Sequence, residues 1–221
     1  MQDVLDTLKK AIEEGQAKDA SKAIQAALDA GAEPGAILRD VMVPAMDEVG
    51  RRYDCGDYFL PEMLISARAM KEALAILRPR LVETDVKPAG TVVAGTVKGD
   101  LHDIGKNLVC MMLEGAGFEV RDLGVDVAPD KFVDAAKSGD VNLIALSALL
   151  TTTLPSMKVT IELLKAAGLR DKVGVMVGGA PINDKLATEI GADGYAEDAA
   201  GAVALARRLV GAPYLSGGDS L

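Results

Sequence analysis

The chain has 221 residues, of which 49% are hydrophobic and 26% charged, a balance typical of a globular protein with a sizeable core. Its formal net charge of −9 argues against a nucleic-acid partner, because neutralising phosphates requires clustered Lys and Arg. No apolar run approaches the ~20 residues that span a bilayer, and the first residues lack a signal-peptide pattern. We therefore expect a cytoplasmic protein without a membrane partner. Cys55 and Cys110 lie far apart without C-x-x-C spacing, so we expect structural thiols.

Apolar residues recur at helical spacing through the first part of the chain, which predicts a helical domain over residues 1–84. Gly15 and Gly31 mark the ends of the first two helices. A third helix is expected from Pro34, kinked or split at Pro44, and a fourth from about Leu60 until Pro79. Short turns between four helices predict an all-α four-helix bundle.

Three aromatic residues, Tyr53, Tyr58 and Phe59, gather between the third and fourth helices of a chain that is only 3% aromatic. Their rings could plug one end of the bundle. Alternatively, the turn could form an apolar lid over a neighbouring site. The residues themselves leave both interpretations open.

Residues 85–90 are polar, contain Pro and Gly, and are expected to form a hinge-like linker. After them the spacing of the apolar residues changes. Short apolar runs then alternate with helical segments. Strands are expected at 91–97, 118–123, 142–147, 173–177 and 193–196, and helices at 103–116, 129–138, 154–168, 182–191 and 198–210. This repeat predicts an α/β, Rossmann-like domain over residues 91–211 with a five-stranded parallel sheet, followed by a flexible tail at 212–221.

Four segments follow the predicted strands, at the edge where open parallel sheets bind ligands. They are residues 99–105, 147–153, 177–181 and 194–195. Their glycines leave room for a ligand against the backbone, and their hydroxyl groups supply neutral hydrogen bonds. The chain lacks a G-x-G-x-x-G fingerprint after its first strand and a G-x-x-x-x-G-K-[ST] loop. A dinucleotide or nucleoside triphosphate is therefore disfavoured.

The first of these segments contains His102, the only histidine in the chain. A single histidine near an aspartate is more often structural than catalytic. However, Asp100 lies two residues earlier in an extended loop, so its carboxylate could orient the imidazole ring. A conventional zinc or iron site needs three or four protein ligands, whereas a metal held in a macrocycle needs only one. The composition lacks the aromatic residues of a usual haem pocket.

Three motifs carry a resemblance to a known family. Asp100-x-His102-x-x-Gly105, Ser147-x-Leu149 and Gly178-Gly179 resemble the three-part signature of cobalamin-binding domains. The helical region with Tyr53-x-x-Gly56-x-Tyr58-Phe59-Leu60-Pro61 is similar to the corrinoid modules of cobalamin-dependent methionine synthase. In size the chain most resembles the corrinoid proteins of methanol, methylamine and methoxyaromatic methyltransferase systems. The resemblance covers about residues 3 to 210 and implies a flavodoxin-like sheet preceded by a helical cap.

The resemblance also implies roles for individual residues. His102 would replace the cofactor's own base as the lower axial ligand of cobalt, giving the base-off form. Asp100 would hold the ring of His102, and Thr153, where the family pattern has serine, would link this pair to solvent. The other residues implied in cofactor binding are Gly99, Asp103, Ile104, Gly105, Ser147, Leu149, Thr151, Gly178, Gly179, Ala180, Tyr195 and, capping the upper face, Tyr53 and Leu60. The family example has Phe where this chain has Tyr53.

By this resemblance the protein is a non-catalytic carrier subunit that binds cobalamin as cob(I)alamin and methylcobalamin. It would take a methyl group from a substrate-specific methyltransferase and pass it to a methyl-accepting methyltransferase, with a reductive activase as a further partner. Alternatives are the small subunit of an adenosylcobalamin mutase, a corrinoid-binding sensor or regulator, and a Rossmann-like domain with another ligand. The sequence does not name the methyl donor.

Overall fold

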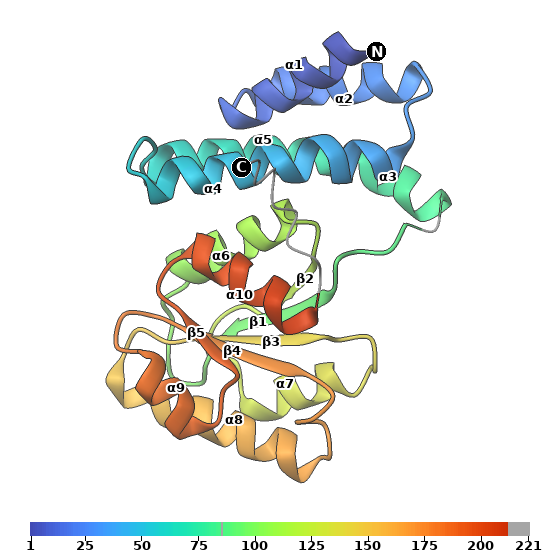
Figure 1. The fold of residues 1–221 in the computed structure, drawn as a ribbon. Coiled ribbons are helices and arrows are strands. Elements are labelled where there is room, and N and C mark those ends of the chain that lie inside the picture. The colour runs from blue at the N-terminus through green and yellow to red at the C-terminus, as the bar shows by residue number, and fades with distance from the viewer. Residues whose placement is uncertain (85, 212–221) are drawn as a thin grey trace, which may run out of the picture. The chain divides into compact units, whose positions relative to one another are not determined.

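A computed structural model describes residues 1–84 and 86–211. Residue 85 of the expected linker and the expected tail at 212–221 lie outside the described residues. The chain divides into two compact units (Figure 1). The first comprises Met1–Pro88 with Glu114–Gly117, and the second comprises Ala89–Leu113 and the described residues from Phe118 onward. Each unit is described separately below.

The first unit is helical, as expected. Its elements are α1 (Gln2–Glu13), α2 (Ala17–Asp29), α3 (Pro34–Ile37), a π-helical segment η1 (Leu38–Met42), α4 (Val43–Asp54) and α5 (Leu60–Glu83). Its core contains Leu8, Ile12, Ile24, Met63 and Met70, all at most 1% exposed. The long, unbranched methionines fill the interior of a unit that lacks tryptophan.

The two prolines inside predicted helices behave differently. The helix that begins at Pro34 is interrupted by η1, and α4 restarts at Val43 with Pro44 in its first turn, so the expected split occurs. The expectation that the last helix ends before Pro79 is wrong, because α5 continues through Pro79 to Glu83. A proline removes only one backbone donor, and Leu81 beyond it is buried, so packing can offset the lost hydrogen bond.

The second unit contains a parallel sheet of five strands in the order β2-β1-β3-β4-β5. The strands are β1 (Thr91–Thr96), β2 (Glu119–Asp122), β3 (Leu143–Ser147), β4 (Gly174–Gly178) and β5 (Gly194–Ala196). The register pairs Thr96 with Ser147, Ser147 with Gly178, and Gly178 with Ala196. The carboxyl ends of four strands therefore form one row, and the strand order reverses between β1 and β3.

Helices cover both faces of this sheet (Figure 1). They are α6 (Ile104–Gly115), α7 (Pro129–Ala136), α8 (Leu154–Ala166), α9 (Asp184–Ile190) and α10 (Ala199–Val210), with a short 3₁₀ helix, η2 (Thr151–Thr153), before α8. Helices α6 and α10 lie on one face, and α7, α8 and α9 lie on the other. On the second face, Phe132 and Ile161 pack against Val93, Ile144 and other strand residues in one apolar core. The alternation of strands and helices predicted this architecture correctly.

None of the helices in the described residues is both long and apolar enough to cross a membrane. Cys55 and Cys110 form no disulfide bond within the described residues. Cys110 is buried, as expected for a structural thiol, whereas Cys55 is exposed in the turn after α4.

Candidate functional site

His102 lies in the loop between β1 and α6, beside the point where the strand order reverses. Its ring atom Nδ1 lies 2.7 Å from Oδ1 of Asp100, so the expected hydrogen bond is present. A carboxylate only accepts hydrogen bonds, so this contact places the ring proton on Nδ1 and leaves the lone pair on Nε2. The histidine side chain is 52% exposed. The ring is thus fixed on one side and accessible to a ligand.

Asp100 connects the histidine loop to the segment that follows β3. Its side chain is fully buried. Oδ1 also accepts the backbone N–H of His102 at 3.1 Å, and Oδ2 accepts the N–H groups of Leu149 and Leu150 at 2.8 and 3.1 Å. Burial alone would raise the pKa of the carboxyl group, but the hydrogen bonds from His102, Leu149 and Leu150 outweigh burial and hold that pKa well below its usual range. Asp100 is therefore a buried carboxylate that stays ionised.

Thr153 completes this polar chain. Its hydroxyl group donates to Oδ2 of Asp100 at 3.0 Å and lies 2.8 Å from the carbonyl oxygen of Leu150. The residue is only 6% exposed, so the hydroxyl is a buried member of the chain rather than an open link to solvent. Thr153 thus supports Asp100 from the side opposite to His102.

Thr96 holds the backbone of the histidine itself. It is the last residue of β1, is completely buried, and donates from Oγ1 to the carbonyl oxygen of His102 at 2.9 Å. This hydrogen bond ties the loop back onto the strand that precedes it. The position of His102 is therefore fixed through its backbone as well as its ring.

Large apolar side chains surround the histidine loop but remain exposed. They follow the carboxyl ends of the three adjacent strands β2, β1 and β3, and we call them the apolar rim. Its members are Leu101, Ile104, Leu123, Val125, Leu149 and Leu150, with exposed fractions from 37% to 81%. Exposed apolar residues at one edge of a sheet indicate a surface that is covered by a ligand or partner.

The start of α6 also faces open space. A Cβ atom built on Gly105 would meet nothing within 4 Å, and Ile104 beside it is 81% exposed. Asp103 precedes the helix and accepts the side-chain amide of Asn107 at 3.0 Å. The buried Lys106 forms an ion pair with Asp122 at the end of β2, which anchors this first turn to the sheet.

The glycines after β4 allow two loops to approach closely. Gly179 has φ +129°, and a Cβ atom there would lie 1.9 Å from the carbonyl oxygen of Ala148. No residue with a side chain fits this position without movement of the backbone. Ser147 and Gly178 are adjacent in the register, and Leu149, Thr151 and Ala180 are exposed beyond them. The structure thus brings the loops after β3 and β4 together beside the Asp100 chain.

Tyr195 lies in β5, opposite Val177, and is half-buried. Burial, followed by the negative charges of Glu197, Asp184 and Asp198, raises the pKa of its hydroxyl group. Tyr195 therefore stays neutral and can serve as a hydrogen-bond donor at the far end of the row of strand ends.

The first unit carries Tyr53 and Leu60 on either side of the turn that connects α4 with α5. Tyr53 is half-buried near the end of α4, while Phe59 and Leu60 are 66% and 41% exposed. Tyr58 instead packs inward: its hydroxyl group donates to the carbonyl oxygen of Glu13 at 3.1 Å. The ring of Tyr58 therefore closes one end of the bundle, as the first interpretation expects, and the ring of Phe59 projects outward, which leaves the lid interpretation as a prediction.

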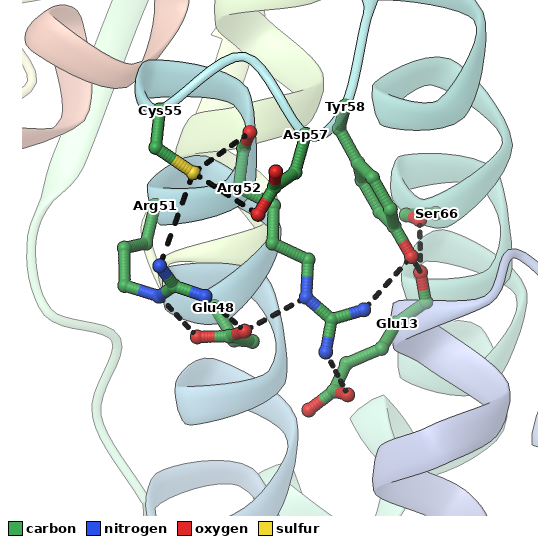
Figure 2. A network of polar contacts seen from close by, with 8 residues as sticks. All are labelled: Glu13, Glu48, Arg51, Arg52, Cys55, Asp57, Tyr58 and Ser66. Carbon is green, nitrogen blue, oxygen red and sulfur yellow. Dashed lines mark hydrogen bonds and ion pairs between the residues drawn. The ribbon is translucent and has the colours of Figure 1, made fainter.

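Arg52 fixes this turn (Figure 2). Its guanidinium group donates to Glu48 at 2.7 Å, to the Tyr58 hydroxyl at 2.9 Å and to Glu13 at 3.2 Å. Its carbon Cζ also lies 5.2 Å from the centre of the Tyr58 ring. Hydrogen bonds from Arg51 and Arg52 lower the pKa of Glu48 to about 2. The exposed apolar residues of the turn thus project from a base that hydrogen bonds and ion pairs connect to α1 and α4.

Sequence reasoning missed several residues of this site. Thr96, Leu123 and Val125 end or follow a strand, which was the available signal, whereas Leu101 and Leu150 lie in the predicted segments 99–105 and 147–153 but were not singled out. Their exposure or hydrogen bonding depends on the loop conformation, which the sequence pattern does not specify. Within residues 1–84 and 86–211, no group of three or more His, Cys, Asp or Glu side chains could hold a bare metal ion.

Comparisons with known proteins follow the same division of the chain. Residues 90–204 match a family described as B12 binding domain, and residues 4–78 match a second family with the same description. The chain is 46% identical over 179 residues to dimethylamine corrinoid protein 1 of Methanosarcina mazei, covering 80% of this chain and 83% of that protein. It is 41% identical over 211 residues to a corrinoid protein of Desulfitobacterium hafniense, covering 94% and 98% of the two chains.

A solved structure is similar over both units. It is the methanol:cobalamin methyltransferase complex of Methanosarcina barkeri, with a TM-score of 0.83 and 32% sequence identity. The match covers 96% of this chain and 81% of the other.

Proposed function

This chain belongs to the B12-binding corrinoid proteins of methyltransferase systems, and on that premise we propose that it moves a methyl group from one methyltransferase to another. It is a methyl-carrying protein with a cobalamin-type cofactor. When bound, the corrinoid supplies a cobalt centre that can accept and release a methyl group. In this proposal His102 is the lower axial ligand of that cobalt, with the cofactor in its base-off form.

The observation that carries this proposal is the hydrogen-bonded chain from Thr153 through Asp100 to His102. Because Asp100 engages Nδ1, the lone pair of Nε2 is available to a metal. Because Asp100 is buried and held by backbone amides, it stays ionised and keeps the ring proton on Nδ1. The proton can be shared more or less strongly with the carboxylate, and this sharing would tune how strongly Nε2 donates to cobalt.

The surroundings of His102 also suit a corrinoid. The apolar rim would cover the hydrophobic part of a large macrocycle, and the open space at Gly105 leaves room for it. We propose that the nucleotide tail of the cofactor lies along Ser147, Leu149, Thr151, the Gly178-Gly179-Ala180 turn and Tyr195. Neutral hydroxyl groups and backbone amides in these segments are suitable partners for such a tail.

We further propose that Tyr53 and Leu60 cap the opposite, methyl-bearing face. Their apolar surfaces would exclude water from the reacting group and would have to withdraw for a partner enzyme to reach it. Residues 85–90 are the linker that would permit this movement, with residues 1–84 as the cap domain and 91–211 as the cofactor domain.

The partners are two methyltransferases, one specific for the methyl donor and one for the acceptor, and we propose a reductive activase as a third. The named complex of a similar structure supports a direct complex with the donor-side enzyme. The names of similar relatives make methylated amines the donor class to test first.

The experiment that tests this proposal is reconstitution of the purified protein with hydroxocobalamin, followed by visible spectroscopy. We expect a bound corrinoid whose spectrum changes in His102→Ala. Failure of the wild-type protein to retain a corrinoid would contradict the function. Identical spectra for wild type and His102→Ala would contradict the assignment of the ligand. If reduction and a methyl donor yield no light-sensitive methylated protein, the carrier role is wrong even though the corrinoid binds.

A further inference from the structure

Asp126, in the loop between β2 and α7, has an unusual backbone conformation. Its φ is +52°, and within the described part of the chain it is the only residue other than glycine with a positive φ. This left-handed region disfavours most L-residues, although Asp and Asn tolerate it better than others. Surrounding contacts must therefore stabilise the conformation of Asp126.

Those contacts all reach the loop that carries His102. The backbone N–H of Asp126 donates to the carbonyl oxygen of Asp100 at 2.9 Å. Its Oδ1 accepts the N–H of Gly99 at 2.8 Å, and its Oδ2 accepts the ammonium group of Lys98 at 3.1 Å. One residue therefore contacts three consecutive residues of the neighbouring loop.

The ion pair with Lys98 is the weakest of the three contacts. The side chains of Lys98 and Asp126 are 56% and 43% exposed, so water screens their attraction. The two bonds to the backbone of Gly99 and Asp100 have a defined direction and carry most of the constraint. The N–H of Gly99, and after it Lys98, lower the pKa of the Asp126 carboxyl group, as expected for an ionised acceptor.

The two loops also run alongside each other before they reach this contact. Beyond the ends of β1 and β2, Val97 and Val127 form an isolated parallel bridge. Thr96 donates to the carbonyl oxygen of Gly124 at 3.0 Å and accepts from Val127 at 3.0 Å. The loop that holds Asp126 is thus anchored to the sheet on both sides of it.

We propose that Asp126 is a positioning residue for the Asp100–His102 pair. By holding the backbone of Gly99 and Asp100, it places the buried carboxylate where it can reach His102 on one side and Leu149, Leu150 and Thr153 on the other. A shift of this backbone by about 1 Å would break several of these bonds together, because hydrogen bonds weaken steeply with distance and angle. The importance of this pair for the cofactor rests on the proposed function, but its geometry can be measured in the protein without a corrinoid.

Two substitutions separate the possible contributions of Asp126. Asp126→Gly keeps the backbone conformation accessible and keeps the N–H donor, but it removes the carboxylate. Asp126→Asn tolerates the same conformation and keeps Oδ1 as an acceptor for Gly99, but it removes the charge opposite Lys98. Asp126→Ser keeps a polar side chain, but one too short to accept the N–H of Gly99, so it also removes this bond.

Asp140 provides a matched control. It precedes β3, at the end of the sheet opposite to the row of carboxyl ends, and pairs with Arg121. Within the described residues, no hydrogen bond or ion pair joins it to the histidine loop. Asp140→Gly makes the same chemical change and tests for a general loss of stability.

The readout is NMR spectroscopy of the untagged protein without corrinoid, labelled with ¹⁵N. Because the chain contains one histidine, its ring signals belong to His102 without further assignment. In the wild type we expect a ring proton on Nδ1 that is protected from exchange by Asp100. In Asp126→Gly we expect loss of that protected proton and roughly tenfold to a hundredfold faster exchange of the amides of Gly99 and His102, since a directed bond to a charged acceptor is lost.

Asp126→Asn and Asp140→Gly should retain the wild-type ring signals, whereas Asp126→Ser should lose them as Asp126→Gly does, because it also lacks the acceptor for Gly99. Wild-type ring signals and amide protection in both Asp126→Gly and Asp126→Ser would overturn the proposal. Loss of the ring signals in Asp126→Asn would overturn it too, by showing that charge matters rather than the bond to Gly99. If the wild type binds no corrinoid but the NMR pattern is as expected, the proposed function fails while the positioning role stands.

Discussion

The Nδ1 atom of His102 lies 2.7 Å from Oδ1 of Asp100, a carboxylate that is fully buried although the imidazole beside it is half exposed. An ionised group is stable in such a place only when its hydrogen-bonding capacity is satisfied. Five hydrogen bonds, two from His102 and one each from Leu149, Leu150 and Thr153, satisfy Asp100. The loops after β1 and β3 are therefore coupled through a single carboxylate.

Asp100→Asn should destabilise the protein without corrinoid by about 2 kcal/mol at pH 7, because an amide nitrogen would face a donor where Oδ1 or Oδ2 now accepts. Chemical denaturation measures this loss. Asp134→Asn is the control, since Asp134 is an exposed partner of Lys137 and should cost less than about 0.5 kcal/mol. Equal losses for the two variants would show that the Asp100 network contributes no special stability.

The same comparison has a defined pH dependence. The pKa of Asp100 is lower in the folded than in the unfolded protein, so ionisation stabilises the fold. The stability difference between wild type and Asp100→Asn should be fully present above about pH 4, the usual range of an aspartate, and should shrink as the pH falls below it. A difference that grows on acidification would contradict this sign.

Thr153→Val and Thr153→Ser separate the hydroxyl group from the shape of the side chain. Thr153→Val should cost about 1 kcal/mol in unfolding free energy, because Asp100 loses a donor and the Leu150 carbonyl loses a nearby hydroxyl group. Thr153→Ser should cost less, since it keeps Oγ. Denaturant unfolding of both variants checks the order, and a larger loss in Thr153→Ser would contradict the role of the hydroxyl.

Two glycines of the site should respond differently to alanine. Gly179→Ala should destabilise the protein without corrinoid by about 2 kcal/mol or more, because its Cβ atom would collide with the backbone of Ala148 and its φ is unfavourable. Gly105→Ala meets open space in the first turn of α6 and should leave the stability unchanged or raise it by up to about 1 kcal/mol.

Corrinoid titration then tests whether the open space beside Gly105 belongs to the cofactor site. Gly105→Ala should weaken corrinoid binding at least roughly tenfold, or by about 1.4 kcal/mol, if its open side is where the macrocycle lies. Wild-type affinity in Gly105→Ala would place the cofactor elsewhere. Thermal unfolding without corrinoid supplies the control for folding.

Arg51 and Arg52, next to each other before the turn that leads to α5, allow a matched comparison of two variants (Figure 2). Arg52→Gln should cost about 2 kcal/mol in the unfolding of the first unit, because it removes partly buried bonds to Glu48, Tyr58 and Glu13. Arg51→Gln should cost less than about 1 kcal/mol, since Arg51 is 61% exposed and pairs mainly with Glu48. Circular dichroism during urea unfolding measures both, and equal losses would contradict the role of Arg52.

The sequence predicted the architecture well where periodicity carries the information. The ten strands and helices of the second unit occur where the apolar runs placed them, since burial on one or both faces imposes those runs. The prediction failed at Pro79, where tertiary packing of Leu81 outweighs a local helix-breaking preference.

The site was only partly predictable for a different reason. Asp100, His102 and Thr153 were identified from their spacing and family resemblance, and the structure joins them by hydrogen bonds. Asp126 and Thr96 were not identified, because their contacts depend on how two loops meet beyond the ends of β1 and β2. The exposure of Leu101 and Leu150 likewise follows from loop conformation rather than from any periodic pattern.

The axial ligation of cobalt by His102 can be measured most directly by electron paramagnetic resonance of the reconstituted protein in its cobalt(II) form. Because the chain contains a single histidine, growth with ¹⁵N-labelled histidine marks one residue only. We predict that the splitting from the axial nitrogen changes from a triplet to a doublet on labelling, and that His102→Ala loses this splitting. A triplet that persists in the labelled protein would show that the cofactor's own base remains the ligand and would contradict the assignment.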